Sequence, residues 1–351
     1  MSVGIRTIAG LCVLAVAAPV RSAGPPAAAA TPEQGRQAVE RGLKFLVDDA
    51  ATWRKERKCA TCHHGTMTVW ALSEAKARGY KVTPEVLADN VKWTKERFAG
   101  IDLPRDKRPG WSMVNTPALH LSMMVAAEPK QEVFSAPELK QIARHLIRHQ
   151  EADGSWGWSA APAQNRPPPV MESDEVATLL GYLALGVQAP AGTKEKSGAR
   201  DAREKAAAWL AKAKPNDTTQ AAALRLAVKA KDGAPRKGLR REIDGLMGRQ
   251  NMDGGWPQVK GAASDAYATG QALYVLSLAG VKGDAAEVLR GVSFLVSTQR
   301  ADGSWPMKSR AHPGAKPMKS PVPITHFGSA WGAMGLMRSV PREGAVLGAR
   351  P

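Results

Sequence analysis

The segment around residue 60 carries the side chains whose types and spacing point most directly to chemistry. It contains Cys59-Ala-Thr-Cys62-His63, which is the spacing C-x-x-C-H. Two thiols one helical turn apart can each bond one vinyl group of a heme, and the next imidazole then lies under the iron. The pattern predicts covalent c-type heme on Cys59 and Cys62, with His63 as the proximal ligand of the heme iron.

The same cysteines admit two other interpretations. Cys59 and Cys62 can form a structural or redox-active disulfide. They can also hold zinc together with His63 or His64 and a fourth ligand. The chain has three cysteines, and the third, Cys12, lies in an N-terminal segment that we expect to be removed. A disulfide framework is therefore not expected.

The N-terminus has the composition of an export signal. Arg6 precedes an apolar run from Ile8 to Val20, and small residues follow as far as Ala23. This pattern predicts a signal peptide over residues 1–23, with an uncleaved anchor as the alternative. An Ala/Pro-rich linker is expected over residues 24–32. The mature protein is thus expected to be secreted or periplasmic, which is where heme of this type is attached.

One short pattern, Q-x-x-D-G-x-W, occurs three times in the chain. The copies begin at Gln150, Gln250 and Gln299 and end at Trp156, Trp256 and Trp305. A motif that recurs at a spacing of about 50 residues, or twice that spacing, indicates a repeat architecture. Asp-Gly favours a turn, Trp is expected to cover the joint between repeats, and Gln can bond backbone groups left open at a helix end.

This pattern resembles the QW motif of squalene-hopene cyclases and oxidosqualene cyclases, whose α/α-toroid fold also occurs in protein prenyltransferase β subunits. The resemblance implies an all-α fold in which inner helices surround a central cavity. The chain divides into six helix-loop-helix units, the number that closes a single α6/α6 toroid, and we expect this domain over residues 33–341 with a tail at 342–351. An unidentified small molecule or an envelope polymer is the expected ligand of the cavity.

The expected helices follow the apolar periodicity. Outer helices are expected near 33–48, 136–149 and 199–212, and inner helices near 63–78, 174–185, 217–231 and from about 265 and 325. Asp217 and Asp265 are expected to cap their helices. Two long Pro-rich connections, 159–170 and 307–323, are expected over one end of the barrel, either as rim loops or as tolerated insertions.

Ring closure suggests a second heme ligand. His326 starts the last inner helix, and the last and first units become neighbours when a ring closes, so His326 is our first choice for the distal position. His64 is adjacent to His63 and points to a different helix face, so it is not favoured. The rival distal arrangements are an open site or one of four other residues, namely Met67, Met113, Met123 and His120.

A cyclase-like function is the alternative. Squalene-hopene cyclases protonate an alkene with a D-x-D-D motif on an inner helix, and the matching segment here is Glu172-Ser-Asp174-Glu175. Clustered carboxylates can keep one acid protonated, so Asp174 is the candidate acid, with Glu172 and Glu175 beside it. Two of the three acids are Glu, and only 5 Phe and 4 Tyr are available to stabilise carbocations. A non-catalytic envelope binding module with a structural C-x-x-C is the third hypothesis.

The formal net charge of +17 is spread along the chain. No nucleic-acid motif is present, and an export signal argues against that partner. A basic surface suits an anionic envelope polymer or an acidic redox partner, and simple solubility explains it equally well.

Overall fold

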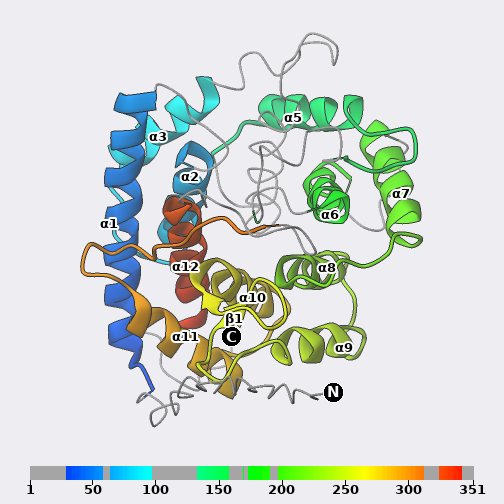
Figure 1. Cartoon of the computed structure of the whole chain (residues 1–351). Helices are drawn as coiled ribbons and strands as arrows, with labels where there is room; N and C mark the ends of the chain where they lie inside the picture. The colour runs from blue at the N-terminus through cyan, green and yellow to red at the C-terminus, as the bar shows by residue number, and fades with distance from the viewer. Residues whose placement is uncertain are drawn as a thin grey trace, which may run out of the picture.

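The computed structural model shows an all-α protein built as a ring of helical hairpins (Figure 1). The residues it describes are 29–57, 64–96, 133–157, 169, 173–189, 197–311 and 324–341. Within these residues there are eleven helices and one pair of two-residue strands. The expected all-α toroid is confirmed.

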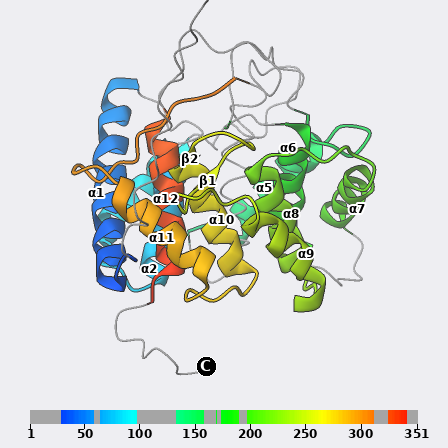
Figure 2. The same cartoon turned by 60° about the horizontal axis from the view of Figure 1, so that its bottom comes forward.

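Two layers of helices make up the ring, as Figure 1 shows from one end and Figure 2 from a tilted view. The outer layer contains α1 (Pro32–Arg57), α3 (Pro84–Glu96), α5 (Ala136–Arg148), α7 (Gly198–Leu210), α9 (Arg236–Met247) and α11 (Ala286–Thr298). The described inner layer contains α2 (Thr66–Ala77), α6 (Asp174–Leu185), α8 (Thr219–Lys231), α10 (Ala266–Leu278) and α12 (Thr325–Ser339).

Burial explains which helices lie inside. In α12, 13 of 15 residues are buried, whereas α9 buries only Leu239 and Leu246 of its 12. A helix that is apolar all round must be enclosed by other helices, while one with a single apolar stripe can face water on its other side. The alternation of these two helix types along the chain therefore places one helix of each hairpin inside the ring.

The first and last units meet at a tightly packed seam. Helix α12 packs against α1, α2 and α10 (Figure 1). Helices α10 and α12 approach so closely that a Cβ atom at Gly270 would lie 2.1 Å from the carbonyl oxygen of Trp331. Only glycine leaves room for that approach. The predicted neighbourhood of the last and first units is thus present in the structure.

The three repeated turns share one set of contacts. Trp156, Trp256 and Trp305 are at most 2% exposed, as expected. Their ring N–H groups donate to carbonyl oxygens in the last turns of the preceding outer helices, at Leu146 (3.0 Å), Leu246 (2.7 Å) and Leu295 (2.8 Å). Each tryptophan, rather than the expected glutamine, therefore donates to a carbonyl group in the last turn of the outer helix before it.

The glutamines of these turns tie one unit to the next. Each donates to the Gly carbonyl of its own turn and to a carbonyl on the following outer helix; these second acceptors are Ala202, Glu287 and Ala38. Because Ala38 belongs to α1, Gln299 joins the last unit to the first. The turn glycine Gly303 has φ +88°, and a Cβ there would lie 2.2 Å from the carbonyl oxygen of Arg41, so no other residue fits this joint.

One helix cap differs from expectation. Asp265 caps α10 as predicted, accepting from the Ala268 N–H at 2.8 Å. Helix α8 instead begins at Thr219 and is capped by Thr218, so the prediction for Asp217 was wrong. The backbone N–H of Thr219 donates to the Gln258 carbonyl, which fixes the start of α8 after Asp217. The Asp217 side chain forms an ion pair with Arg249 instead.

The strands were not anticipated. Strands β1 (Trp256–Pro257) and β2 (Ser264–Asp265) pair antiparallel in the loop between α9 and α10, with Trp256 opposite Asp265. Two-residue strands carry too short a pattern to be recognised in a sequence.

Several expectations lie outside the described residues. They are the signal peptide at 1–23, most of the linker at 24–32, the tail at 342–351, and most of the connections at 159–170 and 307–323. Among the described helices, none combines the length and the apolar character needed to span a bilayer.

Candidate functional site

Three metal-ligand-type side chains meet at the seam between the first and last units. Asp49 comes from α1, His64 from the π-helical turn that precedes α2, and His326 from the first turn of α12. The Asp49 Oδ2 atom lies 2.8 Å from His326 Nδ1 and 3.1 Å from His64 Nε2. One carboxylate oxygen therefore faces both imidazole rings.

The packing of three helices positions this cluster. Phe45, Asp49 and Trp53 are four residues apart on α1 and so lie on the same face of that helix. Trp53 stacks on His64, with ring centroids 4.1 Å apart and planes inclined by 13°. The His64 and His326 ring centroids are also 4.1 Å apart. His326 thus lies beside the residue that follows the C-x-x-C-H motif.

Both ring nitrogens of His326 have partners. Its Nε2 lies 3.1 Å from the Thr68 hydroxyl on α2, while Nδ1 faces Asp49. A threonine hydroxyl can either donate or accept, so it is compatible with both tautomers of the ring. Binding the heme iron directly would cost His326 one of these two contacts. The role of His326 as distal ligand stays a prediction.

Burial and hydrogen bonding together set the charges of His326 and Asp49. His64 and His326 are 6% and 3% exposed. Burial lowers the pKa of His326 to about 4, and the hydrogen bond to Asp49 only partly offsets this effect. Burial also opposes ionisation of Asp49, but hydrogen bonds from His326 and His64 outweigh it and hold the pKa of this carboxyl well below its usual value. Near neutral pH, an ionised carboxylate therefore faces an uncharged His326 imidazole.

Sequence reasoning missed Asp49. It lies near the end of a long helix, beside the equally acidic Asp48, and outside every motif. The available signal was its position midway between Phe45 and Trp53 on a partly buried face of α1, where an acid needs a partner. That signal identifies a half-buried acid but not the two histidines that contact it.

The proposed heme-attachment residues themselves, Cys59, Cys62 and His63, lie outside the described residues. The described chain stops at Arg57, the end of α1, and resumes at His64 in the buried cluster. Of the rival distal ligands, Met67 is buried in α2. The other three, Met113, Met123 and His120, also lie outside the described residues.

The proposed catalytic carboxylates have different environments. Glu175 is buried and accepts from Arg225 Nη1 at 2.6 Å and from the Asn216 N–H at 2.5 Å, which ties α6 to the start of α8. Asp174 is half-buried and is the first residue of α6, after the capping residue Ser173. Glu172 lies outside the described residues. Glu175 thus has a structural ion-pair partner in Arg225. The catalytic roles of Asp174, Glu172 and Glu175 stay predictions.

Asp265 has the raised carboxyl pKa that a catalytic acid needs and that we looked for at Asp174. It is half-buried at the equivalent helix start, and its second carboxylate oxygen accepts from Gln258 Nε2 at 2.7 Å. Burial raises the pKa of Asp265 to about 6, against the lowering effect of these hydrogen bonds. The sequence indicated only a capping role, because the burial of its carboxyl group comes from the folded loop.

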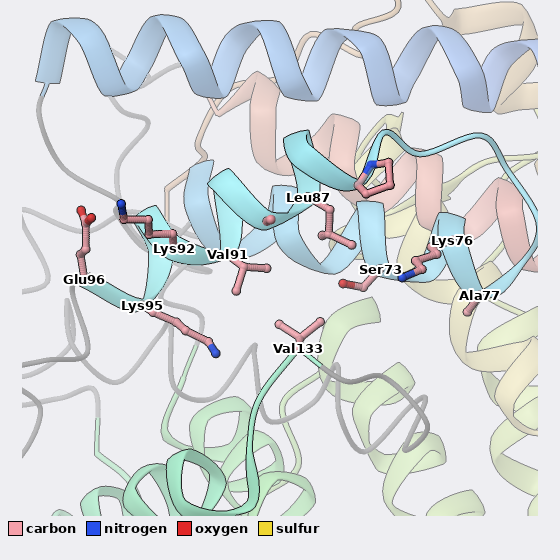
Figure 3. Close-up of a pocket in the computed structure, with 11 residues that line it drawn as sticks. Ser73, Lys76, Ala77, Leu87, Val91, Lys92, Lys95, Glu96 and Val133 are labelled. Atoms are coloured by element: carbon pink, nitrogen blue, oxygen red, sulfur yellow. The ribbon is translucent and has the colours of Figure 1, made fainter.

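A cavity of about 940 Å³ lies along the C-terminal half of α2, facing α3 (Figure 3). Leu87, Val91 and Val133 supply apolar walls, and the lysines at its edge are Lys76, Lys92 and Lys95. The described lining contains no histidine and only one carboxylate, Glu96. We therefore place the candidate chemistry at the Asp49–His64–His326 cluster, at the other end of α2.

No family model matches this chain, and a search of curated proteins found no match. Solved structures do match. Type II terpene cyclase MstE from Scytonema, in complex with geranylgeranyl dihydroxybenzoate, aligns with a TM-score of 0.55 and 15% identity over 89% of this chain and 99% of its own.

Two carbohydrate-enzyme structures align equally well. Unsaturated glucuronyl hydrolase from Bacillus sp. GL1 gives a TM-score of 0.57 and 14% identity over 87% of this chain and 96% of its own. A possible GH105 family member from Salmonella enterica serovar Paratyphi A aligns with a TM-score of 0.56 and 11% identity, over 93% of this chain and 99% of its own. Such low identities carry the fold but not the chemistry, so the chain is an α/α-toroid protein similar to both groups.

Proposed function

We propose that this chain is an exported α/α-toroid protein that carries heme covalently on Cys59 and Cys62, with His63 as the proximal iron ligand. The protein would function in envelope redox chemistry or in heme-linked binding. The observation that carries the proposal is the intact C-x-x-C-H sequence in a chain whose one other cysteine lies in the expected signal peptide.

Described residues on both sides of the motif support the proposal. The residue after the motif, His64, is buried at the seam of the ring, so the chain that directly follows the motif is part of the barrel. The last turn of α1, just before the motif, carries three basic side chains, Arg54, Lys55 and Arg57. Arg54 forms an ion pair with Asp89, so Lys55 and Arg57 would be the cations to pair with the two carboxylates of a heme.

The test is expression of the full chain in a host with a cytochrome c maturation system. We expect heme absorbance and an intact mass equal to the chain from about residue 23 or 24 plus one heme. The double variant Cys59→Ser with Cys62→Ser should lose covalent heme and keep its helical circular dichroism, because α1, α2 and α12 themselves make the contacts of the seam. His63→Ala should retain some attached heme and change the spectrum.

Cys12→Ser is the matched control, since that residue belongs to the segment expected to be removed. Its heme content and mature mass should equal those of the wild type. A wild-type mass matching bare polypeptide would refute the heme proposal. His326→Ala separately tests the distal ligand, because the spectrum changes only if that imidazole binds the iron.

Acid-catalysed cyclisation is the second candidate, favoured by the similarity to the terpene cyclase MstE. Asp174 was the expected acid, and Asp265 adds a carboxyl whose pKa of about 6 keeps part of it protonated near neutral pH. The test is cyclised product from a linear isoprenoid. Loss of that product in Asp174→Asn or Asp265→Asn, with the fold retained, would identify the acid.

A further inference from the structure

We propose that Asp49, His64 and His326 bind a divalent transition-metal ion of the zinc class, at a site separate from the heme-attachment residues. Two imidazole nitrogens and one carboxylate oxygen supply the ligands, and the remaining positions are open to water. This inference does not depend on attachment of heme to Cys59 and Cys62 with His63 on the iron, because none of these residues is among its three ligands. It does require that His326 is not the distal heme ligand.

The positions of the ligand atoms fit one ion. All three candidate atoms lie within 4.8 Å of one another. Metal–ligand distances of about 2.0–2.2 Å in a tetrahedral zinc site place neighbouring ligand atoms roughly 3.3 Å apart. The observed separations from Asp49 Oδ2, 2.8 Å to His326 and 3.1 Å to His64, need only small outward shifts to admit an ion.

The donor set also fits. Two histidines with one carboxylate, leaving open positions, are the ligands of catalytic zinc and of non-heme iron sites. Without an ion, the same oxygen accepts two imidazole N–H groups. With an ion, His326 would bind through Nδ1 and donate its Nε2–H to the Thr68 hydroxyl, the second contact that orients metal-binding histidines.

Surrounding side chains hold both rings in place. The Trp53 ring stacks on His64, and Phe45 lies against His326 with ring centroids 6.5 Å apart. The carboxylate is the most accessible ligand, with 34% of the Asp49 side chain exposed. An ion and its water would therefore enter from the Asp49 side, while both histidines stay buried.

The test uses the full chain carrying Cys59→Ser and Cys62→Ser, so that neither heme nor a cysteine-bound ion contributes. After removal of bound ions, it is titrated with Zn²⁺ by calorimetry and with Co²⁺ by visible absorption. We expect one ion per chain and a Co²⁺ spectrum typical of nitrogen and oxygen ligands. His326→Ala and Asp49→Ala should lose this binding. Thr68→Val should weaken it by about 10- to 100-fold, as expected when the partner of a ligating histidine is removed.

His149→Ala is the matched control, because His149 is equally buried but follows α5 as its C-cap residue, in a different unit. Its ion binding should equal that of the parent. Absence of stoichiometric binding in the cysteine-free chain, or binding that survives both His326→Ala and Asp49→Ala, would overturn the proposal. Heme absorbance of the chain with its cysteines intact is measured separately, so failure of one proposal is distinguishable from failure of the other.

Discussion

At the residue scale, Asp265 combines two roles that act against each other. As the capping residue of α10 it accepts the Ala268 N–H, which favours the ionised carboxylate. Its partial burial disfavours the same charge and dominates, so the pKa of this carboxyl rises to about 6. A residue of this kind stabilises a helix while costing stability at neutral pH.

This balance predicts a pH-dependent effect of Asp265→Asn. Asn caps as well as Asp. In the unfolded chain the Asp265 carboxyl ionises near pH 4, but in the folded protein it does so near pH 6, so the folded state holds the extra proton between these values. The Asp265 contribution to stability is therefore lost as pH rises from about 4 to 6. Relative to wild type, the variant should gain up to about 3 kcal/mol over this range.

Urea unfolding of both proteins at pH 4.5 and 7.5 measures this gain. A difference in unfolding free energy that does not change between the two pH values would show that the carboxyl group is not perturbed.

At the scale of the elements, the repeated turn acts as a joint. Its Trp closes the end of one outer helix, and its Gln bonds the next outer helix. A Cβ atom at Gly291 on α11 would lie 2.8 Å from the Trp256 ring, which shows how closely the ring fills the space between α9 and α11. Removing the ring opens a cavity between two units and takes away the ring N–H that donates to the Leu246 carbonyl.

Trp256→Ala should therefore destabilise the protein by about 3–5 kcal/mol, the usual cost of truncating a large buried aromatic residue. Met252, in the same turn, is 96% exposed and provides the control. Met252→Ala should change the unfolding free energy by less than about 0.5 kcal/mol. Chemical denaturation compares the two variants, and equal midpoints would contradict the role of Trp256 as the filler of the joint.

At the scale of the whole molecule, a buried ionic network closes the ring. Glu74 on α2 is buried, accepts from Arg338 on α12 at 3.0 Å, and accepts from the Tyr274 hydroxyl on α10 at 3.2 Å. Arg78, one turn along α2, pairs with the same carboxylate at 2.6 Å. One side chain thus connects three inner helices at the seam.

Glu74→Gln should cost about 3–5 kcal/mol, because it leaves the buried Arg338 guanidinium without its counter-charge. The exposed pair between Glu33 and Arg36 supplies the comparison. Glu33→Gln should leave the unfolding midpoint almost unchanged, since surface ion pairs contribute little. Unfolding followed by circular dichroism tests both variants. Equal costs would mean that the seam does not depend on the charge of Glu74.

The sequence by itself determined the helical units. The predicted inner helix at 174–185 coincides with α6, and the last inner helix starts at Thr325 as expected. Burial of the three turn tryptophans also followed from the repeat. These features depend on residues close together in the chain, where apolar period and turn chemistry act directly.

Only the tertiary structure decided which polar groups meet. Asp49 and His326 are 277 positions apart, and the packing of α1, α2 and α12 brings them to 2.8 Å. The packing of α6 against α8 pairs Glu175 with Arg225. The contact of the Thr219 N–H with the Gln258 carbonyl accompanies the cap of α8 by Thr218 instead of Asp217. A hydrogen bond or ion pair forms only where two side chains are brought within reach, and helix packing rather than local pattern sets those distances. For this reason the C-x-x-C-H motif could be recognised in the sequence, whereas the Asp49–His64–His326 cluster could be recognised only in the tertiary structure.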